Sequence, residues 1–454
     1  MKMKIKLRSI ELAWHFISVT ILSSAFFAAA RLTELGKMDA GERDFSLQIL
    51  ALIGFSPSLL TIFHLRRIVK TINYSWPLFL LICLSFVSAA WSDIPMTTLQ
   101  RSVAVTIASL YGILLATRYS FDTVIRLLSW MFVIVTTSSF IAVLAGADWA
   151  LEIRDERMYT GIATSVEAWK GVTAGRDSLG YVTGLTTIVA LTYMLFMKRN
   201  TTNKILLGCI LCCSIATLVG TTYVTAIISV IIAVLYLVVL KMNMLLRGSS
   251  VLKFSLVSFI LILITAVAVL FYIPVLELLG RDSTFTGRTL LWESLLNNVI
   301  SRKPILGYGF GSFWQGGTIY QFISEDFNWA GQAHNGYIHM WVELGVIGLF
   351  VFLFMLFQIS GMLLKSVFSD LNNLDSRIFV ITFTGSFLLF ILSINTADST
   401  FTVSNASGSG LLWVLFVYCY TLIVSERFLE EKRKKSISQS EIDSISYVQF
   451  DNKF

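Results

Sequence analysis

Apolar residues follow this chain in long runs separated by short polar stretches. A transmembrane helix needs about 20 mostly apolar residues, and the runs that approach this length number twelve. They cover residues 12–30, 45–63, 77–91, 102–117, 123–145, 180–197, 204–220, 223–240, 252–273, 340–364, 378–395 and 409–425. The third and fourth runs are short, and the seventh and eighth are almost contiguous, so eleven or thirteen spans fit the pattern as well. The pattern predicts an all-α, polytopic integral membrane protein with about 12 transmembrane helices.

The composition supports this interpretation. Of the 454 residues, 56% are hydrophobic and 14% are charged, whereas a soluble domain has about 25% charged residues. We therefore expect one transmembrane domain over residues 1–425. Residues 426–454 are charged and serine-rich, which predicts a disordered cytoplasmic tail.

The distribution of lysine and arginine predicts the orientation. With both termini cytoplasmic, the cytoplasmic side has 23 of the 35 basic residues and ten of the 28 acidic residues. Basic residues concentrate in cytoplasmic loops, so the assignment is self-consistent. The net charge of +7 is then explained by membrane orientation, and we expect no nucleic-acid partner.

Two long segments lie on the opposite, extracytoplasmic side in this topology, at residues 146–179 and 274–339. Long loops in compact proteins are usually functional. The second loop contains "TGRTLLWESLLNNVIS", in which Leu291, Leu295 and Val299 form one apolar stripe. This spacing predicts an amphipathic surface helix. The following "KPILGYGFGSFW" has a proline and three glycines, which predicts a tight turn or a segment that lies along the bilayer interface.

The outer loops carry the residues that could perform chemistry. Arginine binds phosphate oxygens in a bidentate manner and stays charged, and histidine can remove a proton from a hydroxyl near neutral pH. The sequence has no recognisable metal or nucleotide motif. We therefore predict group transfer from a lipid-linked pyrophosphate without metal or cofactor. The candidate base is His334, and the candidate substrate-binding residues are Arg288, Arg176, Asn335, Glu343 and Arg101.

Each of these residues also has a simpler structural interpretation. His334 could be a helix-capping or interfacial residue, and Arg288 could pair with Glu293. Arg101 could anchor a helix at the membrane interface. Glu343 could pair with a nearby arginine.

The other three histidines are predicted to be structural. His339 follows His334 by five residues, about 140° around a helix, so the two side chains should face different ways. We expect His339 at the membrane interface. His15 and His64 fall at the cytoplasmic ends of predicted spans.

Three stretches resemble the O-antigen ligase and Wzy-type polymerase superfamily, and within it the exopolysaccharide-polymerase branch. They are "LSFVSAAWSDIPMTTLQRS" (84–102), "TGRTLLWESLLNN…KPILGYGFGSFW" (286–314) and "AHNGYIHMWVELGVIGLF" (333–350). The resemblance covers the twelve-span plan and most of residues 84–350.

The resemblance implies a multi-pass glycosyltransferase of the bacterial inner membrane, with its active site on the periplasmic face. Such an enzyme transfers glycan from an undecaprenyl-diphosphate-linked oligosaccharide to a glycan acceptor, without metal or nucleotide. The family's histidine falls on His334, and one arginine falls on Arg288. A second arginine is expected in "LVGTTYVTAII" (218–228), where this sequence has none. Arg176 is the candidate to replace it.

Several functions agree with these residues. The leading hypothesis is polymerisation of an exopolysaccharide or O-antigen repeat unit. The first alternative is a ligase that transfers glycan to lipid A core or to a protein. The others are a polysaccharide transporter or flippase and a non-catalytic assembly partner. Membrane lipids, a flippase and a chain-length regulator are the expected partners.

Overall fold

The computed structural model describes residues 2–27, 45–157, 163–197, 200–245, 287–316, 323, 325–327, 330–368, 378–401 and 409–425. The predicted span at 252–273 and the predicted tail at 426–454 lie outside this set. Within it the chain is almost entirely helical, and the prediction of an all-α polytopic membrane protein is confirmed.

Seven helices in the described part of the chain are long and apolar enough to cross a membrane. They are Ile49–Ala90, Pro95–Arg118, Phe121–Leu144, Arg176–Phe196, Thr201–Gly220, Val224–Met242 and Gly336–Lys365. Shorter apolar helices cover Ser9–Leu22, Ile378–Ile394 and Ser409–Ser425. The first of the seven covers most of two predicted runs, 45–63 and 77–91. The total of twelve spans stays a prediction.

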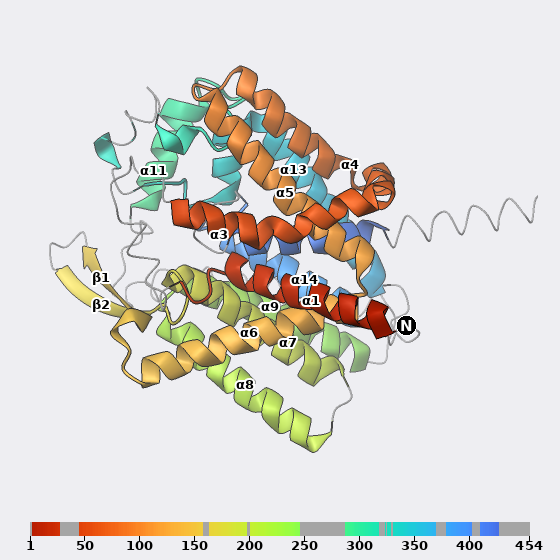
Figure 1. The fold of residues 1–454 in the computed structure, drawn as a ribbon. Coiled ribbons are helices and arrows are strands. Elements are labelled where there is room, and N and C mark those ends of the chain that lie inside the picture. The colour runs from red at the N-terminus through yellow and green to blue at the C-terminus, as the bar shows by residue number, and fades with distance from the viewer. Residues whose placement is uncertain are drawn as a thin grey trace, which may run out of the picture.

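The helices pack in two groups that share one core (Figure 1). One group comprises α6 (Phe121–Leu144), α7 (Arg176–Phe196), α8 (Thr201–Gly220), α9 (Val224–Leu245) and α14 (Ile378–Ile394). The other comprises α4 (Leu65–Val87), α5 (Pro95–Arg118) and α13 (Gly336–Phe368). The first helix, α1 (Lys2–Leu22), contacts α3 (Phe45–Phe55) and α6.

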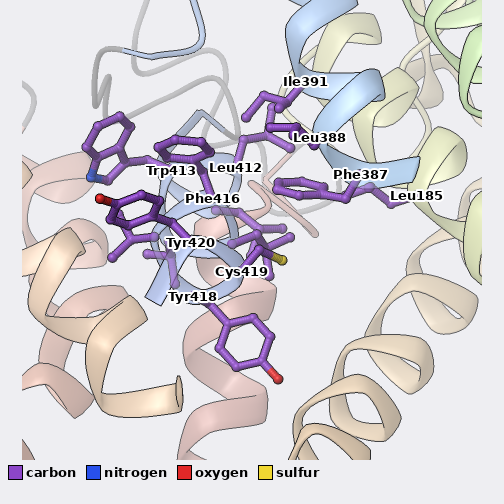
Figure 2. Packing of buried hydrophobic residues seen from close by; sticks show 14 of the residues in the cluster. Leu185, Phe387, Leu388, Ile391, Leu412, Trp413, Phe416, Tyr418, Cys419 and Tyr420 are labelled. Atoms are coloured by element: carbon purple, nitrogen blue, oxygen red, sulfur yellow. The ribbon is translucent and has the colours of Figure 1, made fainter. Parts of the chain in front are cut away.

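The last helix, Ser409–Ser425, lies inside the protein. Its residues from Leu411 to Tyr420 are all nearly inaccessible to solvent. Figure 2 shows its side chains beside Phe387, Leu388 and Ile391 of α14. A helix that is apolar on every side is buried on every side, which explains why this span has few polar residues.

Helices α4 and α5 extend beyond the runs predicted from hydropathy. In α4 the helix bends at Ser75 (φ −106°, ψ 24°), two residues before Pro77, because proline removes a backbone donor and clashes with the preceding turn. Pro95 begins α5, where its missing N–H costs nothing. The polar N-terminal turns of both helices, including Arg101 on the second turn of α5, are therefore helical although their composition is not apolar.

The loop at 146–179 contains a small antiparallel hairpin that the all-α prediction did not include. Strand β1 (Leu151–Arg157) pairs with β2 (Ala163–Trp169), with Leu151 opposite Trp169. The Trp169 ring packs against Gly220, where a Cβ would lie 2.3 Å from the indole. The hairpin is therefore fixed to the end of α8.

A half-buried ion pair connects α1 to α5 at the end of the bundle opposite the hairpin. Arg118 Nε and Nη2 donate to Glu11 at 2.6 and 2.7 Å, and Tyr119 also donates to Glu11. His15 contacts the Tyr119 hydroxyl at 2.9 Å, and His64 accepts from Arg118. These contacts support the structural interpretation of His15 and His64.

The amphipathic helix predicted in the second long loop is confirmed. Helix α11 (Arg288–Ser294) continues into a short π-helical segment, η4 (Leu295–Ile300). Leu291, Leu295 and Val299 are fully buried in a second apolar cluster with Tyr308, Phe313 and Trp314.

Helix α13 is broken at Gly345, which adopts φ 66° and ψ −171°. The break exposes backbone groups that pair with the 304–309 segment. The hydrogen bonds are Tyr308 N to Val342 O, Gly309 N to Glu343 O and Val346 N to Pro304 O, each 2.9 Å. A Cβ at Gly345 would lie 2.0 Å from Ile305 O, and one at Gly307 would lie 2.6 Å from Glu343 O. Two glycines thus allow the two backbones to touch.

We predict that Gly345→Ala lowers the melting temperature of the purified protein strongly, because the new methyl group meets backbone atoms that cannot rotate away. Gly361→Ala, in the same helix, is the control: no atom lies within 4 Å of the added Cβ. That substitution should leave stability unchanged or raise it by about 0.5–1 kcal/mol. Equal melting temperatures for the two variants would contradict the assignment.

Candidate functional site

Several segments that are distant in sequence meet at one end of the bundle, which we call the loop end. It comprises the hairpin β1–β2, the 221–223 turn, α11 and the 330–335 and 395–401 loops. Helices α7, α9 and α13 begin here, and α14 ends here. The predicted residues His334, Arg288 and Arg176 all lie at this end.

The centre of the loop end is the buried carboxylate of Asp398, which is 7% exposed. Oδ2 accepts hydrogen bonds from the hydroxyls of Tyr181 and Tyr223, both at 2.6 Å. Oδ1 accepts from the backbone N–H of Ser399 at 2.7 Å and from Gln332 Nε2 at 3.1 Å. Four donors therefore satisfy a buried charge, as burial requires.

Burial, and secondarily the neighbouring Asp398 carboxylate, raises the pKa of the Tyr223 phenol well above its ordinary value. Tyr223 consequently keeps its proton and remains a donor to Asp398. The hydrogen bond joins the turn before α9 to the loop after α14.

His334 is connected to the Asp398 carboxylate through the side chain of Gln332. Gln332 Nε2, which donates to Asp398, also lies 3.5 Å from His334 Nδ1. Since a carboxylate only accepts hydrogen bonds, Asp398 fixes the orientation of the Gln332 amide. His334 is half-buried and adopts φ 49°, a left-handed conformation that is uncommon for residues other than glycine.

Arg288 and Trp292 lie on one face of α11 and hold the two loops of the site. Gly287, in the left-handed conformation (φ 83°), begins the helix. Arg288 Nη1 donates to the carbonyl of Ala397, next to Asp398. Trp292 Nε1 donates to the carbonyl of Ala333, next to His334, at 2.8 Å. Residues four apart share a helix face, which gives the T-G-R-x-x-x-W pattern a physical basis.

Arg176 reaches the segment in which the resemblance predicted an arginine. Its Nη1 donates to Thr222 Oγ1 at 3.1 Å, and its backbone N–H donates to Glu152 Oε2 at 3.2 Å. Thr222 has φ 51°, which is a strained conformation for a β-branched residue. A guanidinium from α7 thus occupies the position beside 221–223 that no residue of that turn provides.

Asn335 caps α13. Its Oδ1 accepts from the backbone N–H groups of Tyr337 and Ile338 at 3.0 and 3.1 Å, and its Nδ2 donates to Thr396 O. Arg101, on the second turn of α5, packs its aliphatic stem against Gly311. The substrate-binding roles of both residues stay predictions, and the side-chain amide of Asn335 already has structural partners.

The predicted interfacial position of His339 is wrong. His339 is 4% exposed and its ring stacks on Trp314, with centroids 5.5 Å apart. His339 Nε2 lies 2.9 Å from Glu343 Oε1, and Glu343 is 1% exposed. The predicted arginine partner of Glu343 is therefore also wrong, because the pairing residue is one turn away on the same helix.

Four residues of the site were not predicted from the sequence: Asp398, Gln332, Tyr181 and Tyr223. Asp398 is the one acidic residue in "NTADSTFTVSNASGSG", directly after a predicted span. An isolated charge at that position was the available signal. The two tyrosines had none, because tyrosine is common near membrane interfaces. In the described residues, no group of three or more His, Cys, Asp or Glu side chains could hold a metal ion.

Comparison with known proteins finds two similarities to this chain. Residues 207–353 match the family model described as O-antigen ligase. This part of the chain is therefore similar to the O-antigen ligase family. The matched region includes α11, the 330–335 loop and the broken start of α13, so it contains Arg288, His334 and Glu343. Arg176 and Asp398 lie outside the matched region and approach it in space.

The chain is also similar to a curated protein. The chain is 31% identical over 109 residues to the "Exopolysaccharide production protein ExoQ" of Rhizobium meliloti (strain 1021). The similarity covers 23% of this chain and 25% of the relative. The resemblance to the O-antigen ligase and Wzy-like superfamily is confirmed by both comparisons.

We predict that Asp398→Ala destabilises the protein, because it leaves the buried hydroxyls of Tyr181 and Tyr223 and the amide of Gln332 without their acceptor. Each orphaned donor costs about 1–3 kcal/mol. Asp122→Ala, an exposed acidic residue in the first turn of α6, serves as the control and should change stability by about 0.5 kcal/mol or less. Thermal unfolding in detergent measures both. An unchanged melting temperature for Asp398→Ala would show that Asp398 does not hold the loops together.

Proposed function

We propose that this protein is a glycosyltransferase that joins glycan from an undecaprenyl-diphosphate-linked oligosaccharide to an acceptor hydroxyl. The reaction takes place at the periplasmic face of the bacterial inner membrane, with both termini in the cytoplasm. The reaction needs no metal and no cofactor. The excess of basic residues on the opposite side of the predicted topology supports this orientation.

The single observation that carries the proposal is the convergence of His334, Arg288 and Arg176 at the loop end. They come from the 330–335 loop, α11 and α7, and their neighbours are joined through the 395–401 loop and the 221–223 turn. One base and two guanidinium groups suit an acceptor hydroxyl at one side and a diphosphate at the other.

In the proposed step the acceptor oxygen attacks the anomeric carbon while His334 takes the hydroxyl proton. A new carbon–oxygen bond forms as the bond from the anomeric carbon to the diphosphate oxygen breaks. The electron pair leaves with the diphosphate, whose charge Arg288 and Arg176 neutralise. Arg288 donates to a backbone carbonyl and Arg176 donates to a threonine hydroxyl, and a diphosphate can displace these two hydrogen bonds.

Polymerisation of a repeat unit is the form of this function that we favour, because the curated relative is named for exopolysaccharide production. A ligase uses the same donor and differs in the acceptor. Gel analysis of a deletion strain separates them: loss of chain length indicates a polymerase, whereas full-length polymer left on its carrier indicates a ligase.

We predict that His334→Ala abolishes glycan transfer in the deletion strain while the amount of membrane-inserted protein stays unchanged. The expected cause is loss of the base, which contributes typically about 10²–10⁴-fold in rate. The readout is the ladder of glycan lengths at matched protein levels. His64→Ala, at the opposite end of the bundle, is the control and should restore the ladder. Normal chain lengths from His334→Ala would refute the assignment.

We predict that Arg288→Ala and Arg176→Ala each slow donor consumption by about 100-fold, the effect of removing one group that stabilises developing charge. Arg288→Lys should recover only part of the rate, since lysine lacks the bidentate fork. Arg302→Ala, an exposed arginine that follows η4, should keep the wild-type rate. Initial rates with purified protein in liposomes measure these effects, and full activity in both alanine variants would exclude arginine binding of the diphosphate.

A further inference from the structure

A buried pair of ionisable side chains lies directly behind the loop that carries His334. His339 and Glu343 occupy successive turns of α13, and their side chains are 5% and 1% exposed, with 2.9 Å between Nε2 and Oε1. Removing two such groups from water costs several kcal/mol per charge. Glu343 Oε2 adds to this cost, since it has no hydrogen-bond partner among the residues that the structure describes. Apolar side chains at these two positions would avoid the free-energy cost of desolvation. Packing alone therefore does not explain why the chain has His339 and Glu343 here.

The far side of the pair contacts the backbone next to His334. The N–H of Ala333 donates to His339 Nδ1 at 3.5 Å, and the carbonyl of Ala333 accepts from Trp292 Nε1 at 2.8 Å. Ala333 itself is fully buried. Both polar groups of one residue are therefore held by side chains from α13 and α11.

These contacts assign the roles of the two ring nitrogens of His339. Nδ1 accepts the hydrogen bond from the Ala333 N–H, which leaves Nε2 as the donor nitrogen. Nε2 then donates to Glu343, which is the acceptor. The stacked ring of Trp314 keeps the imidazole in the plane in which both contacts are made.

The residue that follows Ala333 is the one in an unusual conformation. His334 has φ 49°, and such a conformation persists only where the surroundings impose it. Asn335 is fixed on the other side by capping α13 and by its backbone hydrogen bond to Ser399 Oγ at 3.1 Å. His334 thus lies between two residues whose backbones are both fixed.

We propose that His339 and Glu343 are positioning residues for His334. They hold the Ala333 backbone, which sets the direction in which the His334 imidazole meets the acceptor hydroxyl. This inference rests on the proposed function of His334. Neither residue touches the substrate, and their role replaces the substrate contact predicted for Glu343 from the sequence.

The test separates positioning from stability. His339→Phe keeps the ring on Trp314 but loses both nitrogens, and Glu343→Ala loses the acceptor. Each single variant leaves one buried polar partner unpaired and should unfold at a lower temperature. The double variant His339→Phe/Glu343→Leu removes both polar groups, and replacing a buried pair by apolar residues often restores stability. Glu343→Gln keeps an acceptor for His339 and is the conservative variant.

The donor is the lipid-linked repeat extracted from a strain that lacks this gene, and kcat and KM are measured with purified protein. We expect the double variant to unfold at a higher temperature than either single variant, although the Ala333 N–H has lost its acceptor. Its kcat should stay about 100-fold lower than that of the wild type, the loss that follows a small misplacement of a reacting group. KM for the donor should stay within about twofold, because Arg288 and Arg176 are untouched. Glu343→Gln should recover most of kcat. Gln358→Leu, further along α13, should match the wild type in kcat.

A stable double variant with wild-type kcat would overturn the inference, because the pair would then contribute nothing to the position of His334. The proposed function fails separately: wild-type protein that consumes no donor, or His334→Ala protein that consumes it normally, refutes that function. A second measurement does not depend on turnover. The rate at which diethyl pyrocarbonate modifies His334, followed by mass spectrometry, should differ between the wild type and the double variant, and equal rates would also overturn the inference.

Discussion

The site depends on one buried carboxylate. Asp398 is surrounded by donors from α7, from the turn before α9 and from the loop before α13, so a single charge joins three parts of the bundle. Burial of an unpaired charge in this environment would have a prohibitive free-energy cost. The donors around Asp398 therefore depend on one another. If one donor moves, the carboxylate loses part of its solvation and the other donors lose their common acceptor. His334, Arg288 and Arg176 are attached to the segments that this interaction holds.

A second constraint comes from backbone satisfaction in a membrane protein. Helix α13 is interrupted at Gly345, and an interrupted helix at membrane depth must find new partners for its N–H and carbonyl groups. The 304–309 segment provides them, and close approach of the two backbones requires glycine on both sides. The P-x-L-G-x-G and E-L-G patterns are therefore two halves of one contact. Their function is to place the first turns of α13, and the residues on them, against the loop end.

The residues that carry the family resemblance fall into two groups: those proposed to contact the substrate and those that hold the backbone in place. Arg288 donates to the 395–401 loop and His334 is connected to it through Gln332, and the substrate would bind at these residues under the proposed function. Trp292, Asn335 and the glycines hold backbone in place. The 221–223 turn has no arginine, but the guanidinium of Arg176 reaches this turn from α7 and contacts Thr222. A positive charge can thus be supplied there by another helix.

The sequence by itself determined the membrane class, most of the helices and the amphipathic stripe of Leu291, Leu295 and Val299, because apolar periodicity is a local property of the chain. It also identified His334, Arg288 and Arg176 as candidates, since their chemistry is visible in isolation. Only the tertiary structure decided that Asp398 joins these segments and that His339 pairs with Glu343 inside the protein. Those contacts connect residues up to 217 positions apart or depend on which face of a helix is covered. Burial and partnership arise from packing, and no local pattern encodes them.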